Sequence, residues 1–321
     1  MPLDSQAKAL LDFIGITTLP GVETMTPQAA RDRGKTFMEM RKQMGGVEPV
    51  HQVRDIDIPS PAGKIPARIY TPAIPAPAPA LIYFHGGGWV LGDRDSHDGV
   101  CRQLANTIPC VAISVDYRLA PEAKFPAAVD DSYAAVEWIA ANAASLGIDP
   151  NRIAVGGDSA GGNLSAVACQ LARDRKGPRL LYQLLIYPAT DMRMNLPSIE
   201  ENAAGPLLTK ASMVWFMNHY LTSEQDKLNP LASPLLAANL RDLPPAFVLT
   251  AECDPLRDEG EAYAKKLRES GVTADSKCYA GMPHGFFSFG AALTQAKEAV
   301  EDSAARLRAA FGLALHHDSA A

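Results

Sequence analysis

A glycine-rich turn between an apolar run and a helix-like segment limits what this chain can fold into. Residues 153–155 are apolar and largely β-branched, as in a buried strand, and residues 164–171 are typical of a helix. Between them, Gly157-Asp158-Ser159-Ala160-Gly161 fits the pattern G-x-S-x-G, which places a serine on a sharp strand-to-helix turn. Side chains two positions either side of Ser159 would collide, so both positions are glycine. The pattern predicts that Ser159 is a nucleophile; the alternative is a tight turn in which the serine has no role.

Strands and helices alternate along the chain around this turn. The pattern predicts strands at 80–84, 110–115, 152–159, 181–187, 246–252 and 272–279, and helices at 95–106, 127–146, from 164 to about 174, 259–270 and 293–311. Alternating apolar and polar residues at 53–58 and 64–70 predict an antiparallel hairpin before them. Nearly continuous apolar strands that alternate with helices are typical of a parallel sheet covered on both faces. The predicted fold class is therefore α/β.

Two segments depart from this alternation. Residues 1–46 have helical apolar spacing, and residues 190–238 combine four prolines with an apolar, helix-like run at 211–221. An insertion of this kind after a sheet strand suggests a cap over the sheet. The N-terminal helices either pack against the core or form part of a lid.

A second glycine cluster, His85-Gly86-Gly87-Gly88-Trp89, directly follows the strand at 80–84. Successive glycines expose backbone N–H groups and let another group approach them closely. A plain glycine turn is the alternative. The spacing G-x-G-x-x-G is missing from the first strand-to-helix turn, so the glycines do not indicate a dinucleotide site.

A nucleophilic serine needs a base, and histidine suits this role because its ordinary pKa is near 6.5. Of the seven histidines, His284 directly follows the last predicted strand. Loops at the carboxyl ends of parallel strands are where sites of this fold class are built. Asp254 follows the strand at 246–252 and would orient the imidazole; its alternative role is to cap the next helix, and Glu252 is the alternative acid. The order nucleophile, acid, base along the chain is typical of the α/β-hydrolase fold.

Taken together, these motifs resemble the bacterial hormone-sensitive lipase family of carboxylesterases, in the subgroup that carries Gly-Asp-Ser-Ala-Gly. The similarity covers nearly the whole chain, and its further elements are Tyr117-Arg118-Leu119-Ala120-Pro121-Glu122, Asp254-Pro255-Leu256-Arg257-Asp258-Glu259 and His284-Gly285-Phe286. The resemblance implies an α/β-hydrolase fold with a catalytic triad of Ser159, Asp254 and His284. It also implies a helical cap made of residues 1–46 and 190–238 over a catalytic domain of residues 47–189 and 239–321.

The resemblance further implies an oxyanion hole formed by the backbone N–H groups of Gly87, Gly88 and Ala160. Trp89 stands where a phenylalanine is common in the family, a change that would narrow the substrate pocket beside the oxyanion loop. Among the apolar residues, Trp89, Met213 and Phe286 are predicted to line that pocket, although each could equally belong to the core.

The expected activity is hydrolysis of short- to medium-chain carboxylic esters through an acyl-enzyme, without a metal or organic cofactor. An amidase or peptidase would share this machinery. A non-catalytic binding protein, as in the plant hormone receptors related to the family, would be expected to have lost a triad residue.

Charge and composition limit the partners. The formal charge of −6 and the lack of a Lys/Arg cluster argue against a nucleic-acid surface. No uninterrupted apolar run approaches the length of a membrane span, and the first residues lack the pattern of a signal peptide. Five scattered cysteines fit reduced thiols in a cytoplasm. We therefore expect a cytoplasmic protein that acts on a small-molecule ester, with no nucleic-acid or membrane partner; the family makes a homodimer plausible.

Overall fold

A single sheet forms the centre of the computed structural model, which describes residues 2–15, 19–44, 48–290 and 292–313. Within these residues the strand order is β1-β2-β4-β3-β5-β6-β7-β8. The strands are β1 (Gln52–Ser60), β2 (Gly63–Thr71), β3 (Ala78–Phe84), β4 (Val111–Val115), β5 (Ile148–Asp158), β6 (Gln183–Ile186), β7 (Ala246–Cys253) and β8 (Ala274–Pro283). β1 and β2 form the predicted antiparallel hairpin, β2 is antiparallel to β4, and the remaining neighbours are parallel. The predicted α/β class is confirmed.

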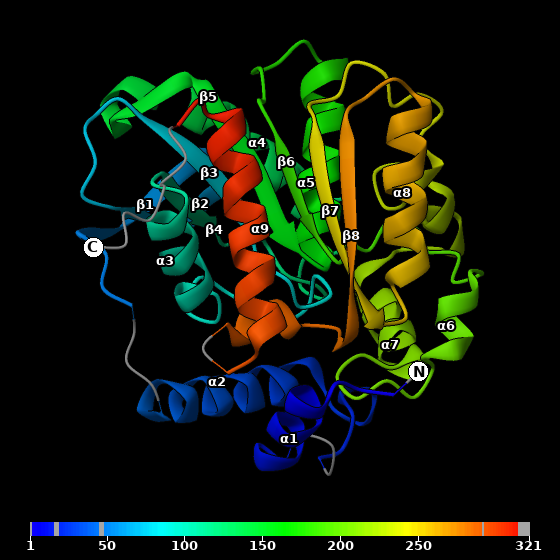
Figure 1. The fold of residues 1–321 in the computed structure, drawn as a ribbon. Coiled ribbons are helices and arrows are strands. Elements are labelled where there is room, and N and C mark those ends of the chain that lie inside the picture. The colour runs from blue at the N-terminus through cyan, green and yellow to red at the C-terminus, as the bar shows by residue number, and fades with distance from the viewer. Residues whose placement is uncertain (1, 16–18, 45–47, 291, 314–321) are drawn as a thin grey trace.

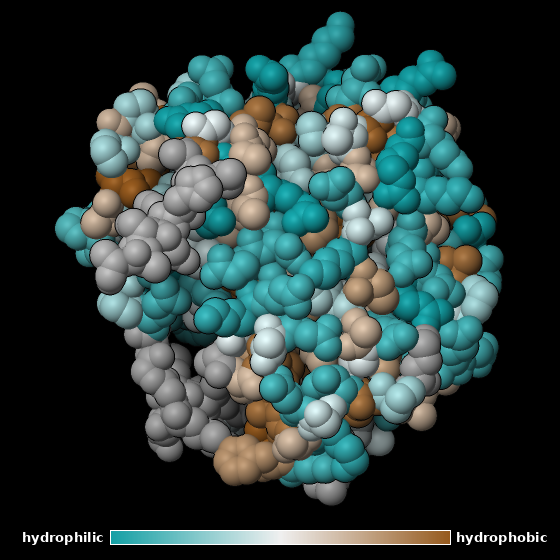
Figure 2. Space-filling view, in the orientation of Figure 1, coloured by the Kyte–Doolittle hydropathy of each residue, from teal (hydrophilic) through white to brown (hydrophobic). Residues whose placement is uncertain are grey.

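Helices cover both faces of the sheet, with α3 and α9 on one face and α4, α5 and α8 on the other (Figure 1). Their bounds are α3 (Asp98–Thr107), α4 (Ala127–Ala141), α5 (Ala160–Asp174), α8 (Arg257–Glu269) and α9 (Thr294–Ala310). Every residue of β3 and β4 is buried, which explains why these strands are apolar without alternation. Figure 2 shows mainly hydrophilic residues on the outside of the α3 and α9 face, with hydrophobic residues in small separate patches. None of the helices described here is long and apolar enough to cross a bilayer.

The segments predicted to form a cap lie beyond the carboxyl ends of the parallel strands (Figure 1). They contain α1 (Ser5–Phe13), α2 (Pro27–Met44), α6 (Pro197–Glu201) and α7 (Lys210–Tyr220). The Asp4 N–H donates to the Gly281 carbonyl at the end of β8 (3.0 Å). The indole of Trp215 in α7 donates to the carbonyl of Met25 (3.2 Å), so the two segments also touch each other. Both segments therefore lie at the edge of the sheet where the predicted site residues gather.

Among the helices that differ from their predicted bounds, two do so for clear local reasons. The helix predicted from residue 95 begins at Asp98, because Asp93 and Ser96 bond each other's backbone N–H groups and form a separate turn (2.7 and 2.8 Å). The helix predicted to reach residue 146 ends at Ala141 and is followed by a short 3₁₀ turn that stops at Gly147 (φ 72°). The five-residue helix α6 was not predicted, because it is too short to show helical periodicity.

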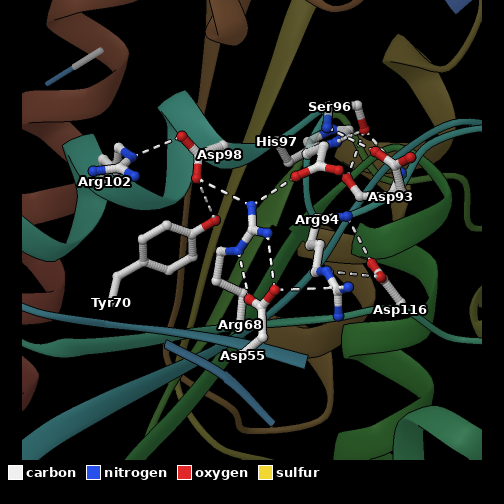
Figure 3. Close-up of polar contacts among 11 residues, drawn as sticks. Asp55, Arg68, Tyr70, Asp93, Arg94, Ser96, His97, Asp98, Arg102 and Asp116 are labelled. Carbon is white, nitrogen blue, oxygen red and sulfur yellow. Dashed lines mark hydrogen bonds and ion pairs between the residues drawn. The ribbon is translucent and has the colours of Figure 1, made fainter. Parts of the chain in front are cut away.

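A network of ion pairs connects the turn at residues 93–96, before α3, to the β1–β2 hairpin (Figure 3). Arg68 of β2 donates to Asp55 (2.7 Å) and to Asp95 (2.7 Å). The Arg94 N–H donates to the carboxylate of Asp116 after β4 (2.6 Å), and the Arg94 guanidinium lies 3.5 Å from the same carboxylate. Burial raises the pKa of Asp116 to about 6 despite these contacts. The network therefore contains one carboxyl group whose ionised form is disfavoured in the folded protein.

Replacing Asp116 by Asn is expected to stabilise the protein at neutral pH. The folded-state pKa of Asp116 lies above its ordinary value of 3.8, so this carboxyl costs stability progressively as pH rises from about 4 to about 6. The amide keeps an acceptor for the Arg94 N–H and removes the cost, which is at most about 3 kcal/mol at neutral pH. Denaturant unfolding should show a larger gain at about pH 7.5 than at about pH 4.5. An equal change at both pH values would contradict this account.

Candidate active site

The predicted nucleophile lies on a strained turn between β5 and α5. Ser159 has φ 55° and ψ −117°, a conformation that costs free energy for a residue with a side chain. The turn packs directly against the end of β3. A Cβ added at Gly157 or Gly161 would lie 2.3 or 1.8 Å from the carbonyl oxygen of Phe84. Glycine is therefore required at both positions, because the backbone of another strand occupies the space of a side chain.

His284 and Asp254 complete a hydrogen-bonded line with this serine. Nε2 of His284 lies 3.0 Å from the Ser159 hydroxyl oxygen, and Nδ1 lies 2.7 Å from Oδ2 of Asp254. The Asp254 carboxylate is fully buried, and its other oxygen accepts the N–H of Leu256 (2.9 Å). A carboxylate that accepts from Nδ1 leaves Nε2 facing the hydroxyl as the proton acceptor. The structure therefore brings three distant loops together in the geometry of nucleophile, base and acid.

Glu252, the alternative acid, and His85, the histidine that precedes the glycine loop, have other contacts in the structure. Glu252 accepts the N–H of Gly281 (2.7 Å). His85 is buried and stacks on Tyr117 with the ring centres 4.3 Å apart. Burial and the positive charge of His97 lower the pKa of His85 to about 4, so His85 is neutral at physiological pH.

The predicted oxyanion loop follows β3 and faces α7. Gly87 and Gly88 have φ values of 116° and 60°, conformations that favour glycine. Ala160 is the first residue of α5, where backbone N–H groups have no partner within the helix. A Cβ added at Gly88 would lie 2.3 Å from the ring of Phe216 in α7. Phe216 was not among the predicted pocket residues, since the apolar run at 211–221 does not reveal which side of the helix faces the loop.

Two of the three predicted pocket residues are nearly buried. Trp89 is 4% exposed and stacks on Tyr220 of α7, with the rings 4.5 Å apart and nearly parallel. Met213 is 9% exposed on the same helix. Trp89 therefore joins the glycine loop to the helix above it.

The third, Phe286, has no exposed surface and packs between Tyr187 and Tyr279, with ring centres 5.9 and 5.2 Å away. The interpretation of Phe286 as a pocket wall is therefore corrected, because its ring belongs to the core behind the site. Tyr187, which was not predicted, packs against the imidazole of His284 instead (4.7 Å). The pattern His284-Gly285-Phe286 could not show that the chain turns the phenylalanine ring inward.

A serine, an imidazole and a buried carboxylate, aligned at the carboxyl ends of a mostly parallel sheet, define a serine hydrolase of the α/β type. Comparison with known proteins agrees. The sequence profile of the α/β-hydrolase fold family matches residues 81–288. The chain belongs to this family.

Named relatives and a solved structure are similar over most of the chain. The carboxylic ester hydrolase LipN of Mycobacterium tuberculosis is 49% identical over 74% of this chain and 64% of LipN, slightly less than two thirds of its length. The ethyl acetate hydrolase of Pseudomonas putida is 43% identical over 73% of this chain and 75% of that protein. The crystal structure of an esterase from Pyrobaculum calidifontis matches with a TM-score of 0.90 and 44% identity, over 98% of this chain and 100% of the other.

Replacing Asp254 by Asn should lower kcat by about 10⁴-fold with little change in KM, because the amide favours the wrong imidazole tautomer. Steady-state kinetics on an activated ester measures this change. Glu252→Gln is the matched control, since Glu252 bonds the Gly281 N–H and not the imidazole. A larger loss in the Glu252 variant than in the Asp254 variant would contradict the assignment of the acid.

Proposed function

We propose that this protein is a serine carboxylesterase of the hormone-sensitive lipase group, which hydrolyses short- to medium-chain carboxylic esters through an acyl-enzyme. One observation carries the proposal: Ser159, on its strained turn, lies in line with His284 and Asp254 at hydrogen-bond distances. The glycine loop beside this line supports the reaction type, because esters pass through a tetrahedral oxyanion that needs N–H donors.

In the proposed reaction, His284 takes the proton of Ser159 while the serine oxygen attacks the ester carbonyl. The N–H groups of Gly87, Gly88 and Ala160 hold the negative oxygen, and each such donor is worth on the order of 10²–10³ in rate. Protonated His284 then gives its proton to the leaving alcohol. The neutral imidazole next activates water, which releases the acid and restores the serine.

The preference for small acyl groups is supported by the apolar residues that lie against the glycine loop. The ring of Phe216 lies against Gly88, and Trp89 and Met213 of the same region remain proposed contacts of the substrate. The similarity to a protein named ethyl acetate hydrolase supports a small ester as well. An amidase would use the same groups, so the leaving group has to be tested directly.

Replacing Ser159 by Ala should leave less than about 1% of the turnover of p-nitrophenyl acetate, because no other group on this line can form the acyl-enzyme. Circular dichroism of the variant serves as the control for folding. The unchanged enzyme should cleave p-nitrophenyl esters of short acyl chains faster than long ones, and much faster than the matching anilides. Preferred cleavage of the anilide would indicate an amidase, and a lack of reaction with either would indicate a binding protein.

We also propose a cytoplasmic location and a homodimer. The thiols of Cys101, Cys110, Cys169 and Cys278 are free, which fits a reducing compartment. β8 is at one edge of the sheet, and an edge strand can pair with a second copy of the chain. Light scattering coupled to gel filtration should give about twice the mass of one chain. The mass of a single chain at micromolar concentration would contradict the homodimer.

A further inference from the structure

The residue before the nucleophile, Asp158, links the serine turn to the oxyanion loop. Its carboxylate is buried and is not one of the groups that bond His284. Oδ1 accepts the hydroxyl of Tyr83 (2.8 Å) and the N–H of Gly86 (3.0 Å), and it lies 3.2 Å from Nε2 of His97. Asp158 therefore joins the nucleophile turn, the first glycine of the loop and the residue before α3.

The contact between Asp158 and Gly86 leaves no space for a side chain on the loop. A Cβ added at Gly86 would lie 2.2 Å from Oδ2 of Asp158. The carboxylate thus rests on the backbone of the loop and bonds it at the same place. Because Gly87 and Gly88 follow directly, their positions relative to Ser159 depend on this contact.

A carboxylate so close to the nucleophile turn has an electrostatic cost for catalysis. A negative charge there would repel the oxyanion as it forms, most strongly where water is excluded. A positive charge on His97 would cancel it. Burial alone would lower the pKa of His97, but the charge of Asp158, with that of Asp93, raises it overall. Burial would likewise raise the pKa of Asp158, yet the charge of His97 lowers it overall.

A contact on the other ring nitrogen, Nδ1, holds the imidazole of His97 in this position. Its Nδ1 lies 2.9 Å from the Ser96 hydroxyl, and Ser96 is fixed by its backbone bonds with Asp93. The ion pairs of Arg68 and Arg94 tie the same turn to β2 and to the end of β4 (Figure 3). The imidazole therefore has contacts on both of its nitrogens, and the network of Figure 3 stabilises the turn that carries it.

We propose that Asp158 and His97 are positioning residues for ester hydrolysis: Asp158 fixes the oxyanion loop against the serine turn, and charged His97 cancels the negative charge of Asp158 where the oxyanion forms. This inference rests on the proposed function, because it assumes that the N–H groups of Gly87 and Gly88 hold that oxyanion.

The test compares His97→Gln, Asp158→Asn and the double variant. In His97→Gln, the glutamine amide can still donate to Asp158 but carries no charge, so kcat on p-nitrophenyl acetate should fall about 10- to 100-fold with KM within about twofold. Adding Asp158→Asn removes the uncompensated carboxylate, so the double variant should be faster than His97→Gln alone. This recovery separates cancellation of charge from a merely structural role.

A second readout is the binding of an alkyl trifluoromethyl ketone. The serine oxygen adds to the ketone carbonyl, the hydroxyl proton moves to His284, and the resulting oxyanion enters the hole. In each variant, the affinity for the trifluoromethyl ketone should fall by the same factor as kcat. The affinity for an unreactive amide of similar shape should stay unchanged.

Asp302→Asn provides a control outside the network of Figure 3. Asp302 is on α9, where its carboxylate accepts from Lys277 (2.7 Å) and from the hydroxyl of Tyr279 (2.7 Å). This variant should lower the melting temperature without changing kcat. The proposal is overturned if His97→Gln keeps kcat within about twofold of the unchanged enzyme, or if the losses in the two single variants simply multiply in the double variant. If Ser159→Ala retains turnover, the proposed function fails; if it is inactive but the His97 variants are unaffected, only this inference fails.

Discussion

The active site depends on one backbone contact, between the turn that carries the nucleophile and the end of the neighbouring strand β3. The carbonyl oxygen of Phe84 occupies the space in which Cβ atoms of Gly157 and Gly161 would lie. This approach holds the serine turn and the glycine loop after β3 side by side. The strained conformation of Ser159 persists because the sheet and α5 fix the residues on both sides of it. The packing of β3 against the serine turn therefore brings the triad and the glycine loop together from distant parts of the chain.

The fold and the triad were predictable because each rests on a strong local signal. Apolar strands indicated the parallel sheet, and the rule that loops at the carboxyl ends of such strands carry the site selected Asp254 and His284. Which side a residue faces was not predictable in the same way. Phe286 turns into the core and Phe216 turns toward the loop, and the apolar character of both is the same. Only the packing of the turn after β8 into the core, and of α7 against the glycine loop, distinguishes them.

The buried polar residues Asp158 and His97, beside the site, were also not predictable from the sequence. Asp158 occupies a variable position of G-x-S-x-G, and His97 follows an ordinary loop, so neither carried a signal by itself. In the structure Nε2 of His97 lies 3.2 Å from the buried carboxylate of Asp158, while His85 has its ring centre 5.6 Å from that of His97 and is neutral. The pKa values of these two neighbouring histidines shift in opposite directions: burial and the charge of His97 lower that of His85, whereas the carboxylate of Asp158 raises that of His97 despite its burial. Such an arrangement depends on how close different loops lie in the folded protein. The spacing of residues along the sequence does not give these distances.

The central claim is that the oxygen of Ser159 forms the covalent bond to the substrate. An alkyl p-nitrophenyl phosphonate tests it directly, since the serine oxygen bonds phosphorus, p-nitrophenolate leaves and the adduct cannot be hydrolysed in the normal way. Mass spectrometry of the digested protein should find one phosphonyl group per chain, on Ser159, with activity lost in proportion to its formation. Loss of activity with the group on another residue, or full activity after Ser159 is modified, would contradict the account.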